Sequence, residues 1–366
     1  MKEVISKFFL ISFVVLFSGC ASKVMDYEHM EKLEENKEYE QMIQVKELPD
    51  EESGKSLLDK QGQSPQEEKQ KSSQDSGKKN SEKKKAETKK ESKKIEEAHK
   101  DKKIEKKMTA TKSKKKEPDY EDSENFIGRR PVKDPFRVGE KIRLSMTYFN
   151  ITAGYMDLMV KPFVEVNGEK AYHFEVDIQS NSFFSRIYTV DDKATTYMNY
   201  ENLLPYNLDI KVRESKQVKE IRSVIDNKTL KGSYWEKKAT KEKGEKERRV
   251  QWDIKPFSQN VISAVYYLRN FTLTPGKKLQ FRVADDGKNY MFKGEVLRRE
   301  KLDTEIGELN TVVVKPEISL QGAFKPVGDI LIWLTDDDRK FVVRIESKIK
   351  IGTIVAKLKS LERGIE

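Results

Sequence analysis

Residues 142–148 read Ile-Arg-Leu-Ser-Met-Thr-Tyr, so apolar and polar side chains alternate along the chain. Successive side chains of a β-strand point to opposite faces of a sheet, and this alternation therefore predicts a strand with one buried face. Similar short runs continue to the end of the sequence. They cover residues 155–160, 172–178, 188–198, 206–212, 219–225, 229–235, 248–254, 279–283, 290–297, 309–314, 329–334, 341–350 and 353–361.

Turn-forming residues separate these runs. They are Asn167-Gly168, Asp226-Asn227, Pro275-Gly276, Asp285-Asp286-Gly287 and Asp336-Asp337-Asp338. Short strands at this spacing, with few helical patterns between them, favour an antiparallel sheet over a parallel one. We therefore predict a mainly β domain over residues 126–366, built as a curled antiparallel sheet or an open or closed β-barrel.

One segment, residues 258–269, has the spacing of a helix instead. Ser258 or Asn260 can cap its first turn, and Val261, Ile262, Val265, Tyr266 and Leu268 recur at intervals of three and four residues. A single short helix is expected to lie over or plug the open end of the curled sheet. Ile262, Val265 and Tyr266 are the candidate lid over a cavity.

Several of these segments, taken together, resemble a bacterial exported domain of unknown function, DUF3108. They are Pro135-Phe136, Val138-Gly139-Glu140-Lys141, Ala153-Gly154, residues 263–269 (Ser-Ala-Val-Tyr-Tyr-Leu-Arg), Trp333-Leu334-Thr335-Asp336-Asp337, Val343-Arg344-Ile345-Glu346 and Ile351-Gly352-Thr353-Ile354. The resemblance covers about residues 135–362. It implies a β-rich domain of the cell envelope and brings no established activity with it.

The amino terminus has the pattern of an export signal. Lys2 and Lys7 precede an apolar run from residue 8 to residue 17, which is too short to span a bilayer because a spanning helix needs roughly 20 residues. The run ends in Phe17-Ser18-Gly19-Cys20, which resembles the lipobox of bacterial lipoproteins. We therefore predict that residues 1–19 are a lipoprotein signal peptide and that Cys20 carries the lipid, palmitate included; the alternative is an ordinary secretory signal.

The residues after Cys20 bear on the compartment. Ala21 and Ser22 follow it without an Asp, which resembles the enterobacterial pattern for the outer membrane. A lipid-anchored protein of the outer membrane that faces the periplasm is expected, with the inner membrane or the cell surface as alternatives. An exported chain does not normally meet nucleic acid, so none is expected as a partner.

Residues 20–125 are expected to be a disordered charged tether. Between residues 21 and 125 there are 26 Lys and 27 Asp+Glu and no Phe or Trp, which leaves too little apolar surface for a core. As a coil, about 105 residues would span about 55–60 Å. The charge is divided, because residues 26–75 are mainly acidic and residues 78–116 hold 18 Lys against 7 acidic groups. The Lys-rich arm is a candidate contact for peptidoglycan or an anionic envelope glycolipid; the alternative is a solvated spacer.

The chain has a net charge of +10. Residues 126–366 account for this excess, because they hold 44 basic and 34 acidic groups. A basic hairpin tip lies between Trp235 and Trp252. Its Lys246, Arg248 and Arg249 are the candidate anion contact, and the alternative is a loop that keeps an edge strand soluble.

Catalytic chemistry has few candidates in this sequence. One Cys excludes an internal disulfide, and three His, of which only His173 is in the domain, leave little for a metal or a base. Asp336, Asp337 and Asp338 fit a turn better than a calcium loop. No catalytic residue, metal or cofactor is predicted.

Three functions remain open. The first is a non-catalytic envelope lipoprotein whose β domain binds an apolar or amphipathic ligand or a partner protein, and we favour it. The second is a structural tether that bridges the outer membrane and the cell wall through the Lys-rich arm. The third is a hydrolase of an envelope substrate, for which Asp336, Asp337, His173 and Arg344 would have to converge.

Overall fold

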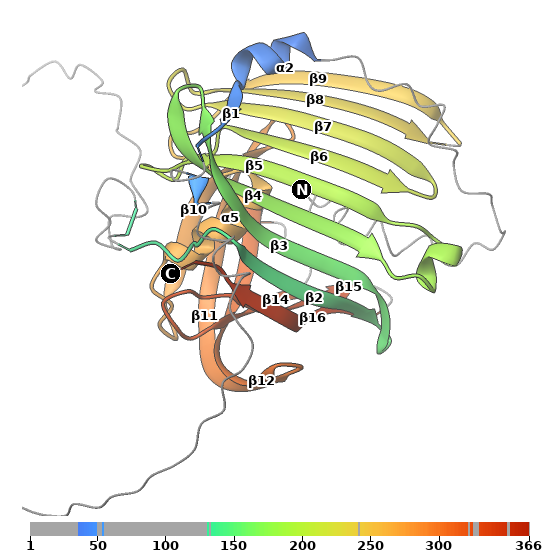
Figure 1. Cartoon of the computed structure of the whole chain (residues 1–366), viewed down its shortest axis with the longest axis vertical. Helices are drawn as coiled ribbons and strands as arrows, with labels where there is room; N and C mark the ends of the chain where they lie inside the picture. Colours follow the sequence, from blue (N-terminus) through green and yellow to red (C-terminus); the bar gives the residue numbers. More distant parts are fainter. Residues whose placement is uncertain are drawn as a thin grey trace, which may run out of the picture. The chain divides into compact units, whose positions relative to one another are not determined.

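The computed structural model describes residues 36–49, 53–54, 130–131, 133–240, 242–320, 323–324, 329–349 and 352–365 (Figure 1). Its helices are α2 (Lys37–Met42), η3 (Phe184–Arg186), α5 (Val261–Tyr267) and η4 (Leu268–Asn270). The strands are β1 (Val45–Glu47), β2 (Glu140–Tyr148), β3 (Ile151–Val166), β4 (Glu169–Ser180), β5 (Asp191–Asn199), β6 (Asn207–Glu214), β7 (Gln217–Asp226), β8 (Lys231–Thr240), β9 (Gly244–Asp253), β10 (Lys278–Asp285), β11 (Lys288–Thr304), β12 (Gly307–Leu320), β13 (Ala323–Phe324), β14 (Asp329–Thr335), β15 (Val342–Ile349) and β16 (Gly352–Arg363).

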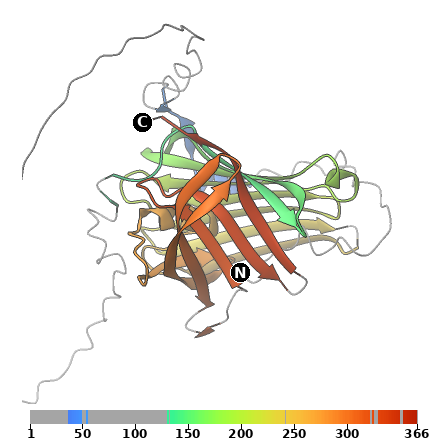
Figure 2. The ribbon, with the colours of Figure 1, turned by 90° about the horizontal axis from the view of Figure 1, so that it is seen from below.

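One antiparallel sheet contains all of these strands. Its order is β10-β11-β12-β14-β15-β16-β2-β3-β4-β5-β6-β7-β8-β9, with β1 paired to β3 and β13 paired to β12. The sheet curls around α5, as Figures 1 and 2 show, but β9 and β10 remain its edges and do not pair. The predicted fold class, a curled antiparallel sheet with one short helix, is confirmed in its open form.

The alternation in the sequence sets which side chains face inward. In β2, Ile142, Leu144 and Met146 join the main hydrophobic cluster, whereas Arg143 lies on the outer face and pairs with Asp157 of β3. Turn residues then reverse the chain. Asn167 and Gly168 both have positive φ values, 53° and 84°, as a two-residue hairpin turn requires.

Helix α5 begins where the sequence predicts. The side chain of Asn260 accepts hydrogen bonds from the amides of Ile262 and Ser263, and the Ser263 hydroxyl accepts one from the amide of Asn260. Asn260 also donates to Thr196 of β5, at 2.8 Å, so the same residue caps the helix and fixes it to the sheet.

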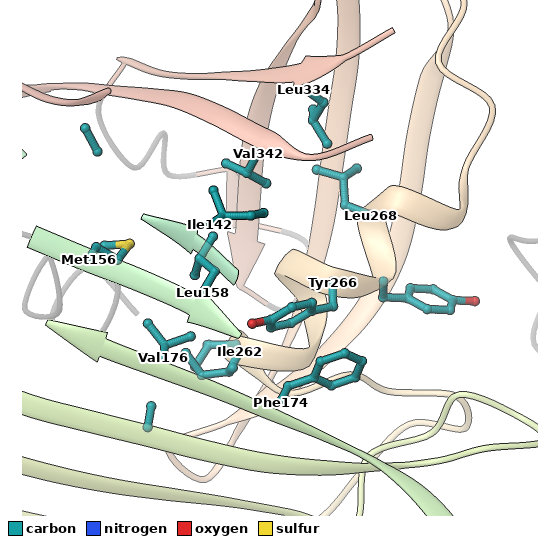
Figure 3. Close-up of a cluster of buried hydrophobic side chains, with 14 of the residues drawn as sticks. Ile142, Met156, Leu158, Phe174, Val176, Ile262, Tyr266, Leu268, Leu334 and Val342 are labelled. Atoms are coloured by element: carbon teal, nitrogen blue, oxygen red, sulfur yellow. The ribbon is translucent and has the colours of Figure 1, made fainter. Parts of the chain in front are cut away.

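The helix is packed inside the curl. Tyr266 is 1% exposed, its ring stacks on Phe174 of β4 with centroids 4.0 Å apart, and its hydroxyl donates to the carbonyl of Met159. Figure 3 shows Ile262 and Tyr266 beside Phe174 and Val176 of β4, and Leu268 beside Leu334 of β14 and Val342 of β15. Ile262 is also buried and Val265 is half-buried. The expected lid is therefore a part of the core rather than a separate cover, because aromatic rings fill the space between helix and sheet.

The two edge strands approach each other without a ladder of hydrogen bonds. Gln259, which comes after β9 in the sequence, forms two backbone hydrogen bonds with β10. Its amide donates to the Arg282 carbonyl, and its carbonyl accepts from the amide of Ala284. The guanidinium of Arg248 in β9 pairs with Asp286 in the turn after β10. These contacts connect the β9 and β10 edges, although the two strands do not pair and the sheet stays open.

A buried ionic cluster joins four separate parts of the chain. Glu140 at the start of β2 accepts hydrogen bonds from both terminal nitrogens of Arg269, at 2.6 and 2.9 Å, and from Arg339, at 2.9 Å. Arg269 and Glu140 are each 1% exposed. Arg339 also donates to the carbonyl of Arg363 at the end of β16.

The structure corrects the expected tether in one place. Within residues 20–125, α2 is ordered against the outer face of the sheet, and β1 joins the sheet by pairing with residues 164–166 of β3. Tyr39 of α2 is buried, meets the ring of Trp235 edge-on and accepts a hydrogen bond from Asn207. Tyr39 and Ile43 supply the apolar contact that the composition of the segment as a whole did not reveal, and β1 adds backbone pairing. The signal peptide, Cys20 and the Lys-rich arm lie outside the described residues.

We predict that Glu140→Gln destabilises the fold by about 3–5 kcal/mol, because it leaves two buried guanidinium groups without a carboxylate. Urea unfolding followed by tryptophan fluorescence measures the change. Glu346→Gln is the matched control, since Glu346 pairs with Arg344 at a partly exposed site and its loss should cost less than about 1 kcal/mol. Equal losses in the two variants would contradict the role given to Glu140.

We also predict that Tyr39→Ala releases α2 and β1 while the rest of the sheet stays folded. The amide of Asn167 donates to the Gln44 carbonyl, so its hydrogen exchange reports on the docked segment. Exchange at Asn167 should become fast in Tyr39→Ala and stay slow in Met42→Ala, because Met42 is 38% exposed on the same helix. Slow exchange in both variants would show that Tyr39 does not hold the segment.

Candidate functional site

The three residues of the candidate anion contact are divided between the two faces of the sheet. Arg248 lies on the inner face, with its guanidinium 5.2 Å from the ring centroid of Tyr234, and Lys246 is two residues away on the same face of β9. Arg249 lies on the outer face and pairs with Glu38 of α2. They do not form one site, and Arg249 has a structural partner.

The inner face of β5 to β9 carries charged side chains toward one end of the sheet, the end opposite α5. We call this set the inner polar surface. It comprises Asp192, Glu214, Lys219, Glu236, Lys238, Lys246 and Arg248. Register places these residues in rows across the strands: Val212 faces Lys219, Lys219 faces Lys238, and Lys238 faces Lys246.

Two carboxylates of this surface are held by hydrogen bonds. Glu214 accepts from the hydroxyl of Tyr188, at 2.7 Å, and from the side-chain amide of Gln217, at 2.6 Å. Glu236 accepts from the hydroxyl of Tyr234, at 2.8 Å, and lies 3.4 Å from the ammonium of Lys219. The carboxylates of Glu214 and Glu236 are thus fixed in position, and Lys219 is paired with one of them.

Burial shifts the ionisation of several inward-facing carboxyls. It raises the pKa of Asp192 to about 8, with the negative charge of Glu214 adding to the effect, although the amide of Arg213 donates to Asp192. Burial also raises the pKa of Glu214 and raises the pKa of Asp285 to about 7. Asp285 is 2% exposed, and its Oδ2 has no hydrogen-bond partner among the described residues. Such groups are typical of binding sites because burial without a partner is costly.

Exposed apolar side chains gather at the same end of the sheet. Phe149 and Ile151 flank the β2–β3 turn and are 69% and 56% exposed, and Phe183 and Ile187, each 62% exposed, lie in the β4–β5 loop. The side chain and the amide of Asn181 donate to the carbonyls of Thr152 and Ala153, so the two loops are neighbours. We call these four residues the apolar rim. The sequence did not indicate the rim, because Phe149-Asn150 is a weak turn signal. The exposure of an apolar side chain also depends on which strands lie beside it.

The residues required for the hydrolase alternative lie apart. His173 is on the outer face of β4, against the ring of Tyr197, and burial lowers its pKa to about 4. Asp337 accepts hydrogen bonds from the amides of Arg339 and Lys340 and closes the turn after β14. Asp336 pairs with Arg299, and Arg344 pairs with Glu346. Each of these side chains has a local structural contact, and no contact joins His173 to the other three within the described residues.

The described part of the chain has neither a membrane-spanning helix nor a cluster of metal-binding side chains. None of its helices is long and apolar enough to cross a bilayer. It contains no group of three or more His, Cys, Asp or Glu side chains arranged to hold a metal ion.

We predict that Asp192→Asn stabilises the domain at neutral pH. An Asp whose pKa is raised on folding keeps its proton in the folded state, so stability falls as pH rises from about 4 toward about 8. Between pH 5 and pH 7 the wild-type chain should lose about 1–3 kcal/mol relative to Asp192→Asn in urea unfolding. Asp303→Asn, at an exposed position of β11, is the control. Parallel pH profiles for wild type and Asp192→Asn would contradict the buried, protonated state.

Solved structures that resemble this one include three bacterial proteins. A β-barrel-like protein of domain of unknown function DUF1849 from Brucella abortus matches with a TM-score of 0.41 and 13% identity, over 62% of this chain and 97% of that one. A candidate lipoprotein from Parabacteroides distasonis matches with a TM-score of 0.28 and 10% identity, over 63% and 97%. A candidate exported protein with a YmcC-like fold from Bacteroides fragilis matches with a TM-score of 0.29 and 9% identity, over 63% and 98%.

No curated protein matches the chain. Its residues 143–359, which run from β2 to β16, match the family described as "Protein of unknown function (DUF3108)". The match covers more than half of the sequence and agrees with the resemblance seen in its motifs. The chain therefore belongs to the DUF3108 family.

Proposed function

We propose that this chain is a non-catalytic lipoprotein of the bacterial envelope whose β domain binds an amphipathic ligand inside the curl of its sheet. The observation that carries the proposal is the inner polar surface. A sheet that needed only a stable core would be apolar there, because burying ionisable groups costs free energy. Asp192 and Glu214 are nevertheless 5% and 2% exposed on the inner face.

The two ends of the curled sheet differ, and this difference indicates that a ligand would enter at the end opposite α5. At one end α5, Phe174 and the ionic cluster around Glu140 fill the interior. At the other end the inner polar surface lies beside the apolar rim of Phe149, Ile151, Phe183 and Ile187. A ligand with an apolar part and a polar head matches this combination, whereas a purely polar solute would gain nothing from the rim.

The proposed location follows from the amino-terminal pattern. A lipid on Cys20 would hold the domain at a membrane, with the periplasmic face of the outer membrane as the favoured place. Acyl chains contribute about 0.8 kcal/mol for each buried methylene, so several chains give stable anchoring. The ligand would then be drawn from the surrounding lipids or from amphiphiles that pass between the membranes.

We predict that native mass spectrometry of the chain, purified from a bacterial host, detects a bound amphiphile that organic solvent removes. Phe183→Ser should lower the bound fraction because it removes part of the apolar rim. Ile306→Ser is the matched control, since Ile306 is 46% exposed in the turn between β11 and β12. A ligand-free wild-type chain would contradict the proposal, and equal occupancy in the two variants would exclude the rim as the entrance.

A further inference from the structure

The two faces of the sheet arrange charge differently across the same strands. On the outer face, register places Lys211 against Glu220, Glu220 against Lys237, and Lys237 against Glu247, so the sign alternates. Opposite charges on adjacent strands stabilise a sheet.

One row of the inner face, next to this outer row in register, holds charges of the same sign, although Glu236 and Arg248 face each other in the following inner row. Lys219, Lys238 and Lys246 stand in register on β7, β8 and β9. Adjacent strands lie about 4.8 Å apart, and like charges directly opposite each other are destabilising. Across the strands of this row a cation therefore faces a cation, although Lys219 is also paired with Glu236 at 3.4 Å.

Lys238 is the central member of the row. It forms no salt bridge or hydrogen bond with another described residue, whereas Lys219 lies 3.4 Å from Glu236. Burial lowers the pKa of Lys238, and the charge of Lys219 adds to that effect, whereas the charges of Glu236 and Glu214 act against it. A partly buried ammonium between two others has the electrostatic character of an anion site.

The neighbouring charges leave the row positive. Glu236 is engaged by Lys219 and Tyr234, and Glu214 by Tyr188 and Gln217. Asp192, with its raised pKa, is largely protonated at pH 7. Lys246 is exposed, so the row is reached from the open end of the curl.

We propose that Lys219, Lys238 and Lys246 form an oxyanion-binding site that holds the phosphate group of an amphipathic envelope lipid. This inference rests on the proposed function and adds the chemical class of the ligand. Three ammonium groups on adjacent strands match the oxygens of one phosphate, and charge-assisted hydrogen bonds to them offset the repulsion within the row. The apolar rim takes the alkyl part.

Isothermal titration calorimetry with three probes tests the site. Octyl phosphate carries both the chain and the anion, octyl glucoside carries the chain alone, and inorganic phosphate carries the anion alone. The protein is the chain from Ala21 onward, which retains every described residue and lacks the expected lipid. We expect octyl phosphate to bind wild type and to bind Lys238→Gln at least about tenfold more weakly.

Lys237→Gln is the matched control, because Lys237 is the adjacent residue on the outer face and pairs with Glu245 and Glu247. Its affinity for octyl phosphate should stay within about twofold of wild type, and Lys238→Arg should retain most of the binding. Lys238→Gln removes a repulsion and is expected to fold at least as stably as wild type, which urea unfolding verifies.

The possible results distinguish a failure of the proposed phosphate site from a failure of the proposed binding of an amphipathic ligand. Octyl phosphate that binds Lys238→Gln and wild type equally overturns the anion site, and octyl glucoside binding would then leave the proposed function standing. Inorganic phosphate that binds as tightly as octyl phosphate overturns the assignment to a lipid in favour of a free anion. No binding of either alkyl probe to wild type overturns both proposals.

Discussion

The carboxylate of Glu140 lies between two guanidinium groups in the interior, and the position of the core helix depends on it. Arg269 follows α5 directly, and Arg339 follows β14. Both also donate to the carbonyl of Pro135, which precedes β2. Moving any one of these segments would leave a charge in a dry environment, where an unpaired ion costs several kcal/mol. The helix is therefore held at one end of the curl. The inner face at the other end carries the charged side chains of the inner polar surface.

This division gives the open sheet two unlike halves. Near α5, buried aromatic rings such as Phe174, Tyr266 and Phe281 fill the interior. Farther along β5 to β9 the inner face turns polar, and the pKa of Asp192 is raised because water is largely excluded there. The seam between β9 and β10 is bridged by Gln259 and by the pair of Arg248 and Asp286, so the curl keeps its shape without closing. The same curled sheet therefore holds α5 at one end and carries the inner polar surface and the apolar rim at the other.

Much of the fold could be predicted from local patterns, because alternation, caps and turns act over a few residues. Residues 142–148 fall within β2, Asn260 caps α5, and Asn167-Gly168 forms a hairpin turn. The candidate site could not be derived in the same way. Arg248 and Arg249 are adjacent in sequence, yet they face opposite sides, and the partner of Arg249 is 211 residues away. The row of Lys219, Lys238 and Lys246 exists only through strand register, and the pairing of Glu140 with Arg269 joins residues 129 apart. Interactions set by register and long-range contacts leave no periodic signal in the chain.

The docked segment also changes how the charged region would act in a lipid-anchored protein. Fifteen residues separate Cys20 from Asn36, whereas the expected tether has 105 residues after Cys20. Tyr39 and β1 fasten the chain to the outer face before the Lys-rich arm begins. In the sequence the Lys-rich arm, residues 78–116, comes after this attachment and before Arg130, whose side chain donates to the Tyr200 carbonyl. If Cys20 carries a lipid, the covalent link between that lipid and the docked segment is therefore the 15 residues before Asn36, and the Lys-rich arm lies outside that link.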